Sequence, residues 1–145
     1  MDRTVTAAHA RGSVSIQLAV LAPVVFVFFA LVTVAGRYGL ARQAMDAAAF
    51  EAARTASQVT DATVAGPRAH DAALRSLQAQ GIRCGALDVQ VDLSGYAQPP
   101  GTPAIVTVTV TCQVDNTDIA VPGIPGHTTL TSVFWSPLDL YRTRS

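Results

Sequence analysis

The sequence contains no lysine and little charge of either sign. All ten basic residues are arginine, ten acidic residues balance them, and charged residues make up 14% of the 145-residue chain. A neutral chain of this kind has no basic surface for phosphate backbones and no acidic tail, which excludes nucleic acid as an expected partner. The length of the chain leaves room for one small domain outside its longest hydrophobic run.

Residues that carry chemistry are also scarce. The three histidines, His9, His70 and His127, are far apart in the chain, and no glycine-rich phosphate loop, nucleophile motif or metal-ligand pair occurs. Asp88 and Asp92 lie on one side of an expected strand. A solvated face is the simpler interpretation of this pair, and an exported calcium site is the alternative. The sequence therefore predicts a protein that is not an enzyme, with no cofactor and no small-molecule ligand.

What the chain does have is one long hydrophobic run. Residues Ser13–Gly36 carry no formal charge and lie between Arg11 and Arg37. As a helix with a rise of ~1.5 Å per residue, the run is roughly 36 Å long, enough to cross a hydrocarbon core of about 30 Å. We interpret residues 13–36 as a transmembrane helix. A secretory signal peptide and a buried helix of a soluble core are the alternatives.

The arginines near the span barely distinguish its two orientations, because two lie shortly before it and two shortly after it. The free amino terminus tips the balance toward an N-terminus inside the cell. The cysteine pair and the threonine-rich strands favour an exported C-terminal part. We therefore expect residues 1–12 to be a cytoplasmic leader, residues 37–145 to be an exported domain, and the protein to cross the cytoplasmic membrane once.

An alanine-rich stretch follows the span and predicts that the helix continues over residues 37–59. Steps of three and four place small and apolar side chains on one narrow stripe, which lets another element approach closely. The stripe either contacts a partner or packs against the chain's own domain, and both interpretations are open. The candidate contact stripe consists of Tyr38, Ala41, Met45, Ala48 and Ala52, continued by Thr55 and Val59.

The rest of the chain predicts a small α+β domain. Pro67 and Gly81 favour a short helix over residues 67–79, with Pro67 at its first position and Gly81 just after its end. Alternating polarity then predicts an antiparallel sheet of about three strands, and Gly95–Pro103 reads as a loose loop. The expected strands cover residues 86–94, 104–114 and 128–135.

The two cysteines, Cys84 and Cys112, lie in the part expected to be exported, where an even count suits a disulfide. Matching the apolar faces of the first two strands places Cys112 opposite Gly85 or Leu87. The alternation would put Cys84 on the polar face, so we expect it to reach in from the preceding turn. A bridge would add roughly 3 to 4 kcal/mol of stability in the chain-entropy model, and two buried free thiols are the alternative.

One arrangement extends from Arg11 to Ala56. An Arg-Gly pair and a small residue precede the apolar helix, which carries Leu-Ala-Pro at residues 21–23 and runs into an alanine-rich continuation. This arrangement resembles the TadE-like family of minor pilins and pseudopilins from tight-adherence pilus systems. The resemblance implies a non-enzymatic role in assembly of, or secretion by, such a pilus system. It implies the lipid bilayer and other pilin-like or Tad-system membrane proteins as partners.

The resemblance also implies roles for three residues. A prepilin-type peptidase would cut after Gly12 and leave Ser13 as the new N-terminus. The fifth residue after such a cut is usually glutamate in this family and is Gln17 here. Gln17 is therefore the candidate assembly position, with a neutral hydrogen bond in place of a charge. A different hypothesis is a membrane-tethered or secreted binding domain, or an unrecognised enzyme, unrelated to pili.

Overall fold

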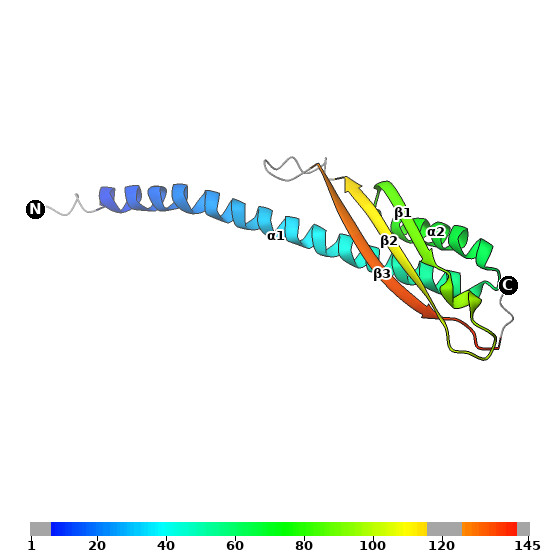
Figure 1. Ribbon diagram of the computed structural model, residues 1–145. Coiled ribbons are helices and arrows are strands. Elements are labelled where there is room, and N and C mark those ends of the chain that lie inside the picture. The colour runs from blue at the N-terminus through cyan, green and yellow to red at the C-terminus, as the bar shows by residue number, and fades with distance from the viewer. Residues whose placement is uncertain (1–6, 116–125, 142–145) are drawn as a thin grey trace, which may run out of the picture. The chain divides into compact units, whose positions relative to one another are not determined.

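The structure is a computed structural model that describes residues 7–115 and 126–141, with side chains described for residues 17–114 and 126–141. The chain divides into two compact units, Met1–Gly39 and Leu40–Ser145. Its helices and strands confirm the expected α+β class. They are α1 (Ala7–Gln58), α2 (Ala62–Ala79), β1 (Cys84–Asp92), the 3₁₀-helix η1 (Ser94–Ala97), β2 (Ile105–Asp115) and β3 (His127–Pro137) (Figure 1).

Helix α1 contains both the expected span and its alanine-rich continuation. It ends at Gln58, close to the expected end, but begins at Ala7, inside the stretch expected to precede the helix. The alanines that follow Ala7 are strong helix formers, and Gly12 costs a helix only about 1 kcal/mol, so nothing stops the helix before Ser13. Pro23 lies inside α1, where it removes one backbone hydrogen bond without ending the helix.

Helix α2 begins five residues before Pro67, so the expected start at Pro67 is wrong. The carboxylate of Asp61 accepts hydrogen bonds from the backbone N–H of Thr63 at 2.8 Å and from its hydroxyl at 2.7 Å. Asp61 is thus the N-cap, and an N-cap sets a helix start more strongly than a proline that fits several positions. The other end agrees with expectation, because Gly81 follows the cap with a φ of 73°, which suits glycine.

The three strands form one antiparallel sheet in the order β1-β2-β3. In the middle strand, Val108 pairs with Val91 of β1 and with Phe134 of β3. The expected pairing of the first two strands is confirmed, and Cys112 pairs with Leu87, one of the two expected partners. The side chain of Val108 is fully buried, whereas that of the neighbouring Thr107 is only partly buried, as strand alternation requires.

Helix α2 and the part of α1 from Leu40 onward lie on one face of the sheet (Figure 1). The helices contribute mainly alanine to the core, while the sheet contributes mainly valine. Small side chains on the helices allow close packing against the β-branched surface. The buried core consists of Ala44, Met45, Ala48, Ala49, Ala52, Ala53, Ala56, Ala65, Ala69, Ala73, Leu77, Tyr96, Val106, Val108, Val110, Cys112, Leu130 and Leu138.

The first three residues of the stretch expected to be a loose loop belong to η1. Two of them, Gly95 and Tyr96, are buried. A Cβ atom on Gly95 would lie 2.2 Å from the backbone oxygen of Ile105, so the close approach of η1 to β2 requires glycine there. The expectation of a loose loop was wrong because this approach depends on a contact with β2 that turn-forming residues alone do not reveal.

Candidate functional site

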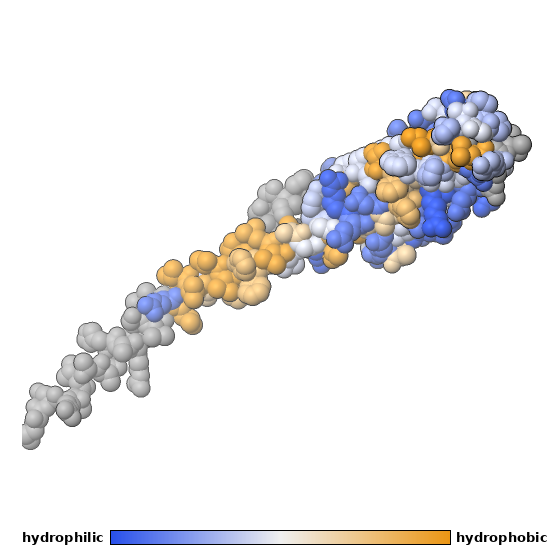
Figure 2. All heavy atoms as spheres, turned by 90° about the horizontal axis from the view of Figure 1, so that it is seen from below, coloured by the Kyte–Doolittle hydropathy of each residue, from blue (hydrophilic) through white to orange (hydrophobic). Residues whose placement is uncertain are grey.

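The first unit presents an apolar helix surface. Its side chains from Leu18 to Val32 are largely exposed, for example Phe26 at 76%. On the face seen in Figure 2, hydrophobic residues cover the helix of the first unit. Among the described residues, one helix is long and apolar enough to cross a membrane, and its most apolar window has no buried residue. In water such a surface is unfavourable, whereas the hydrocarbon of a bilayer solvates it.

The candidate processing and assembly residues all fall in this helix. Gly12 and Ser13 are helical in backbone, and Gln17 lies one turn further along. The side chain of Gln17 is exposed and makes no hydrogen bond within the described part of the chain. Thr33, by contrast, donates its hydroxyl hydrogen to the carbonyl oxygen of Phe29 at 2.8 Å. Among the residues that the structure describes, Gln17 is therefore a polar side chain without a hydrogen-bond partner on an apolar surface.

The candidate contact stripe divides into a buried part and an exposed part. Met45, Ala48 and Ala52 have no exposed surface and belong to the core of the second unit. Ala41 is partly buried beside this core, and Tyr38, which lies in the first unit, is 51% exposed. The buried three are in contact with the chain's own domain, so the centre of the stripe is closed to a partner, whereas the end at Tyr38 is exposed.

Residues beside the stripe attach α1 to the edge strand β3. Arg42 donates to the carbonyl oxygen of Thr131 at 3.1 Å, and Ser132 donates to the carboxylate of Asp46 at 2.6 Å. Further along both elements, the rings of Phe50 and Phe134 meet edge to face at 5.0 Å. The sequence offered no signal for these contacts, because Arg42 and Asp46 resemble any solvated pair on a helix.

A disulfide joins Cys84 to Cys112. The expectation that Cys84 reaches in from a turn is wrong, since Cys84 is the first residue of β1 and pairs with Val114. The register shifts between Cys84 and Ala86, so Gly85 is an extra residue that reverses the alternation. This β-bulge brings both sulfur atoms to the same face of the sheet. A bulge cannot be read from polarity alone, although a glycine beside the out-of-phase residue was a signal for it.

Two aspartates of the second unit have a lowered pKa. Hydrogen bonds from the hydroxyl and then the backbone N–H of Thr63 lower the pKa of Asp61. The backbone N–H of Ser94, followed by its hydroxyl, lowers the pKa of Asp92. Both carboxylates are fully exposed and cap local turns, so their shifts reflect structural hydrogen bonds. Asp88 accepts a hydrogen bond from Gln90 at 2.9 Å, and the described residues contain no group of three metal-ligating side chains.

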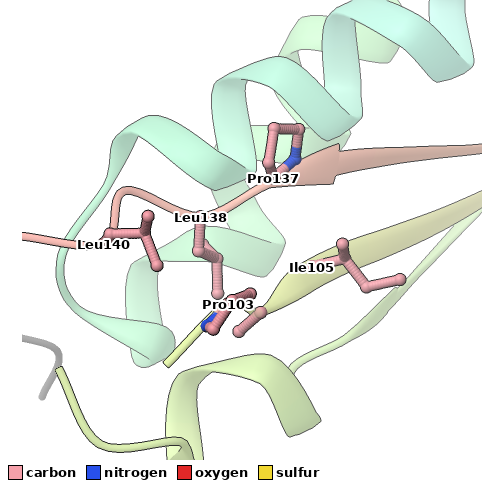
Figure 3. A pocket seen from close by; sticks show the side chains of 6 residues that line it. Pro103, Ile105, Pro137, Leu138 and Leu140 are labelled. Atoms are coloured by element: carbon pink, nitrogen blue, oxygen red, sulfur yellow. The ribbon is translucent and has the colours of Figure 1, made fainter. Parts of the chain in front are cut away.

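A small cavity of about 300 Å³ lies where the chain leaves β3 (Figure 3). Every side chain that lines it is apolar, so it offers no acid, base or nucleophile for catalysis and no polar group to orient a ligand. Two of the lining residues are joined through the backbone, with the N–H of Leu138 donating to the carbonyl of Ala104 at 2.9 Å. The lining residues are Pro103, Ala104, Ile105, Pro137, Leu138 and Leu140.

Residues 12–54 match the family model described as TadE-like protein. The match begins at Gly12, covers the apolar part of α1 and extends into its alanine-rich part. It therefore confirms, for this segment, the resemblance drawn from Arg11 to Ala56. No curated protein matches the chain, and no solved structure does.

Proposed function

We propose that this chain is a non-enzymatic, single-pass membrane protein that assists assembly of a tight-adherence pilus or secretion by its machinery. The observation that carries the proposal is the coincidence of the TadE-like match at residues 12–54 with the uncharged, exposed helix surface of the first unit. A family match over an exposed apolar helix supports a role in the membrane. The apolar cavity of the second unit supports a structural role over catalysis.

The proposal includes a processing step and an orientation. Residues 1–12 form a cytoplasmic leader, and a prepilin-type peptidase cuts after Gly12, so that Ser13 becomes the N-terminus. Residues 13–36 then anchor the chain in the cytoplasmic membrane, and residues 37–145 are exported. The disulfide between Cys84 and Cys112 supports this orientation, because disulfides persist in oxidising compartments outside the cytoplasm.

Mass spectrometry of the N-terminal peptide, taken from carbonate-washed membranes, tests the processing step. We expect a chain that begins at Ser13. A matched Gly12→Arg variant should keep its leader and remain in the same membrane fraction, because the anchor is unchanged. A chain that begins near Arg37 and leaves the membrane would instead identify a secreted protein, and an uncut wild-type chain would reject processing while retaining the anchor.

Thiol alkylation of intact cells tests the orientation. With the domain exported and bridged, a maleimide reagent should label neither Cys84 nor Cys112 until a membrane-impermeant reductant is added outside the cells. A Cys112→Ser variant leaves Cys84, which is only partly buried, as a free thiol and serves as the positive control for labelling. Labelling that requires permeabilised cells would place the domain on the cytoplasmic side and contradict the proposed orientation.

A further inference from the structure

The face of the sheet that points away from the helices is open. Helix α2 and the part of α1 from Leu40 onward lie on the other face, against the buried valines of β2 (Figure 1). Strand alternation therefore turns the odd-numbered residues of β2 and β3, and the even-numbered residues of β1 from Ala86 onward, away from the helices. Each of these side chains that the structure describes is exposed or only partly buried. A partner can therefore reach this face.

One row across the open face joins an aromatic side chain to a carboxylate. Trp135 of β3 is 60% exposed and is the single tryptophan of the chain. Asp92 of β1 lies in the same row, because both residues pair with Thr107 of β2. Two strand spacings separate their Cα atoms, which amounts to about 10 Å. Both side chains project from the same face, so a group held above Thr107 lies within reach of each.

The charge of the open face is negative. Asp88 and Asp92 are both exposed and lie four residues apart on β1, about 13 Å along the strand. The three strands carry no lysine or arginine, and neither aspartate has an ion-pair partner among the described residues. The carboxylate of Asp92 accepts a hydrogen bond from the backbone N–H of Ser94 at 2.9 Å, which fixes its position. A carboxylate accepts about four such bonds, so it keeps capacity for a cationic donor.

We infer that the open face binds an arginine-bearing segment of a partner protein, with one guanidinium group stacked on Trp135 and paired with Asp92. The negative charge of the face determines that the partner is cationic. The indole determines which cation fits, because a guanidinium is flat and can stack on a ring while its N–H groups donate to a carboxylate. A lysine ammonium is a compact charge without such a plane. The hydroxyl of Thr107 offers a further acceptor beneath the bound group.

Asp88 extends this site along β1. Gln90 lies between the two aspartates and donates to the carboxylate of Asp88 at 2.9 Å, which holds it in place on the face. Residues four positions apart on an extended segment point to the same side and have the same spacing as Asp88 and Asp92. The partner segment is therefore extended and carries two arginines four positions apart.

The fluorescence of Trp135 tests the inference directly, because no other tryptophan contributes to the emission. The full chain, in a non-ionic detergent, is titrated with a serine- and threonine-based peptide that carries two arginines four positions apart. We expect a saturable change in emission that weakens as the salt concentration rises. A peptide with citrulline in place of arginine keeps the planar group without its charge. This matched control should give no saturable change.

Substitutions on the face test the two contacts separately. Asp92→Asn should weaken peptide binding by about two- to fivefold, as for one exposed ion pair. Trp135→Leu, followed by calorimetry because it removes the fluorophore, should weaken binding by about the same factor. Asp71→Asn removes an equal charge from an exposed position on α2 and should leave the affinity unchanged. Arginines three positions apart should also bind more weakly, because they point to opposite sides of an extended segment.

The outcomes that would overturn the inference are distinct. Equal binding of the arginine and citrulline peptides, or full affinity of Asp92→Asn, would remove the role of charge. A lysine peptide that binds as tightly as the arginine peptide would remove the stacking on Trp135. A saturable response to a neutral oligosaccharide but not to the arginine peptide would assign the face to another class of ligand. Far-ultraviolet circular dichroism verifies that each variant is folded, and none of these results depends on the proposed membrane anchor.

Discussion

The hydroxyl of Tyr96 donates a hydrogen bond to the backbone carbonyl oxygen of Ala56, forty positions earlier, and lies 3.3 Å from the carbonyl of Val59. Helix α1 ends at Gln58, so these oxygens belong to the last turn and the residue just after it, where carbonyls lack the usual donor four residues on. The carbonyl of Ala56 also accepts the backbone N–H of Val59 at 3.3 Å. A buried side chain of η1 thus satisfies the C-terminal end of the longest helix. Tyr96 is 7% exposed, so water cannot easily replace it.

Tyr96→Phe should therefore destabilise the second unit by about 1 to 3 kcal/mol, because it removes a buried hydrogen-bond donor from the carbonyl groups at the end of α1. Urea denaturation of the detergent-solubilised full chain, followed by near-ultraviolet circular dichroism, measures the change. Tyr141 is 93% exposed, so Tyr141→Phe is the control and should have no effect. Equal stability of the two variants would show that the cap contributes nothing.

Gly95→Ala should also destabilise the domain, by about 1 to 3 kcal/mol, because the new methyl group would overlap the carbonyl oxygen of Ile105 and force η1 away from β2. Gly39 has open space around its Cβ position inside α1, so Gly39→Ala should cause no loss. The same denaturation experiment compares the two. A wild-type midpoint for Gly95→Ala would mean that η1 moves freely relative to the sheet.

Reduction of the bridge between Cys84 and Cys112 should lower the stability of the second unit by about 3 to 4 kcal/mol, since it releases a long loop in the unfolded chain. Thermal unfolding with and without dithiothreitol measures this effect. The double variant Cys84→Ser and Cys112→Ser should match the reduced wild type and ignore the reductant. A reductant-insensitive wild type would indicate two free thiols.

Ala48→Leu distinguishes the two interpretations of the stripe on α1. Ala48 has no exposed surface, so a larger side chain should overpack the core and cost about 1 to 3 kcal/mol of stability. Tyr38 is 51% exposed, so Tyr38→Ala should leave stability within about 0.5 kcal/mol of wild type. If Ala48→Leu kept full stability and lost only association with other subunits, the stripe would be a partner surface.

Acid should weaken the domain through its two capping aspartates. The pKa values of Asp61 and Asp92 are lowered in the folded state, by Thr63 and Ser94 respectively. A lowered pKa contributes stability that is present above the unfolded pKa of about 4 and is lost as the pH falls through the folded pKa. The double variant Asp61→Asn and Asp92→Asn should therefore lose less stability than the wild type when the pH falls from about 5 to about 2, roughly the range in which these carboxylates become protonated. Identical pH dependence of variant and wild type would contradict this.

Local patterns predicted most elements of the fold. Charge and hydropathy marked the apolar part of α1, and the alternation of valine and threonine predicted β2 and its pairing of Cys112 with Leu87. The start of α2 at Ala62, five residues before Pro67, was missed because Asp61 competes with Pro67 as a start signal. The sequence did not predict that residue 95 must be glycine, because this requirement comes from its close contact with Ile105 in β2.

Sequence predicted the candidate site residues only where the residue type and its immediate neighbours are enough to identify them. Gln17 can be recognised from the sequence alone, because no neighbouring residue of this uncharged helix has a polar side chain of the same length. The burial of Met45, Ala48 and Ala52 required the sheet that covers them. An alanine-rich stripe carries the same pattern whether it faces its own domain or a partner, so sequence periodicity cannot distinguish the two cases.

Gly85, the extra residue in β1, places the thiol of Cys84 on the face of the sheet where it bonds to Cys112. Alternation along a strand has a period of two, so a regular strand in which Gly85 itself paired with Val114 would turn Cys84 outward and place Arg83 over the core. The thiol of Cys112 would then remain buried alone, while that of Cys84 would face solvent. Such a chain would form bridges between molecules when oxidised, so the register of one strand, to a single residue, decides whether oxidation stabilises this domain or links it to its neighbours.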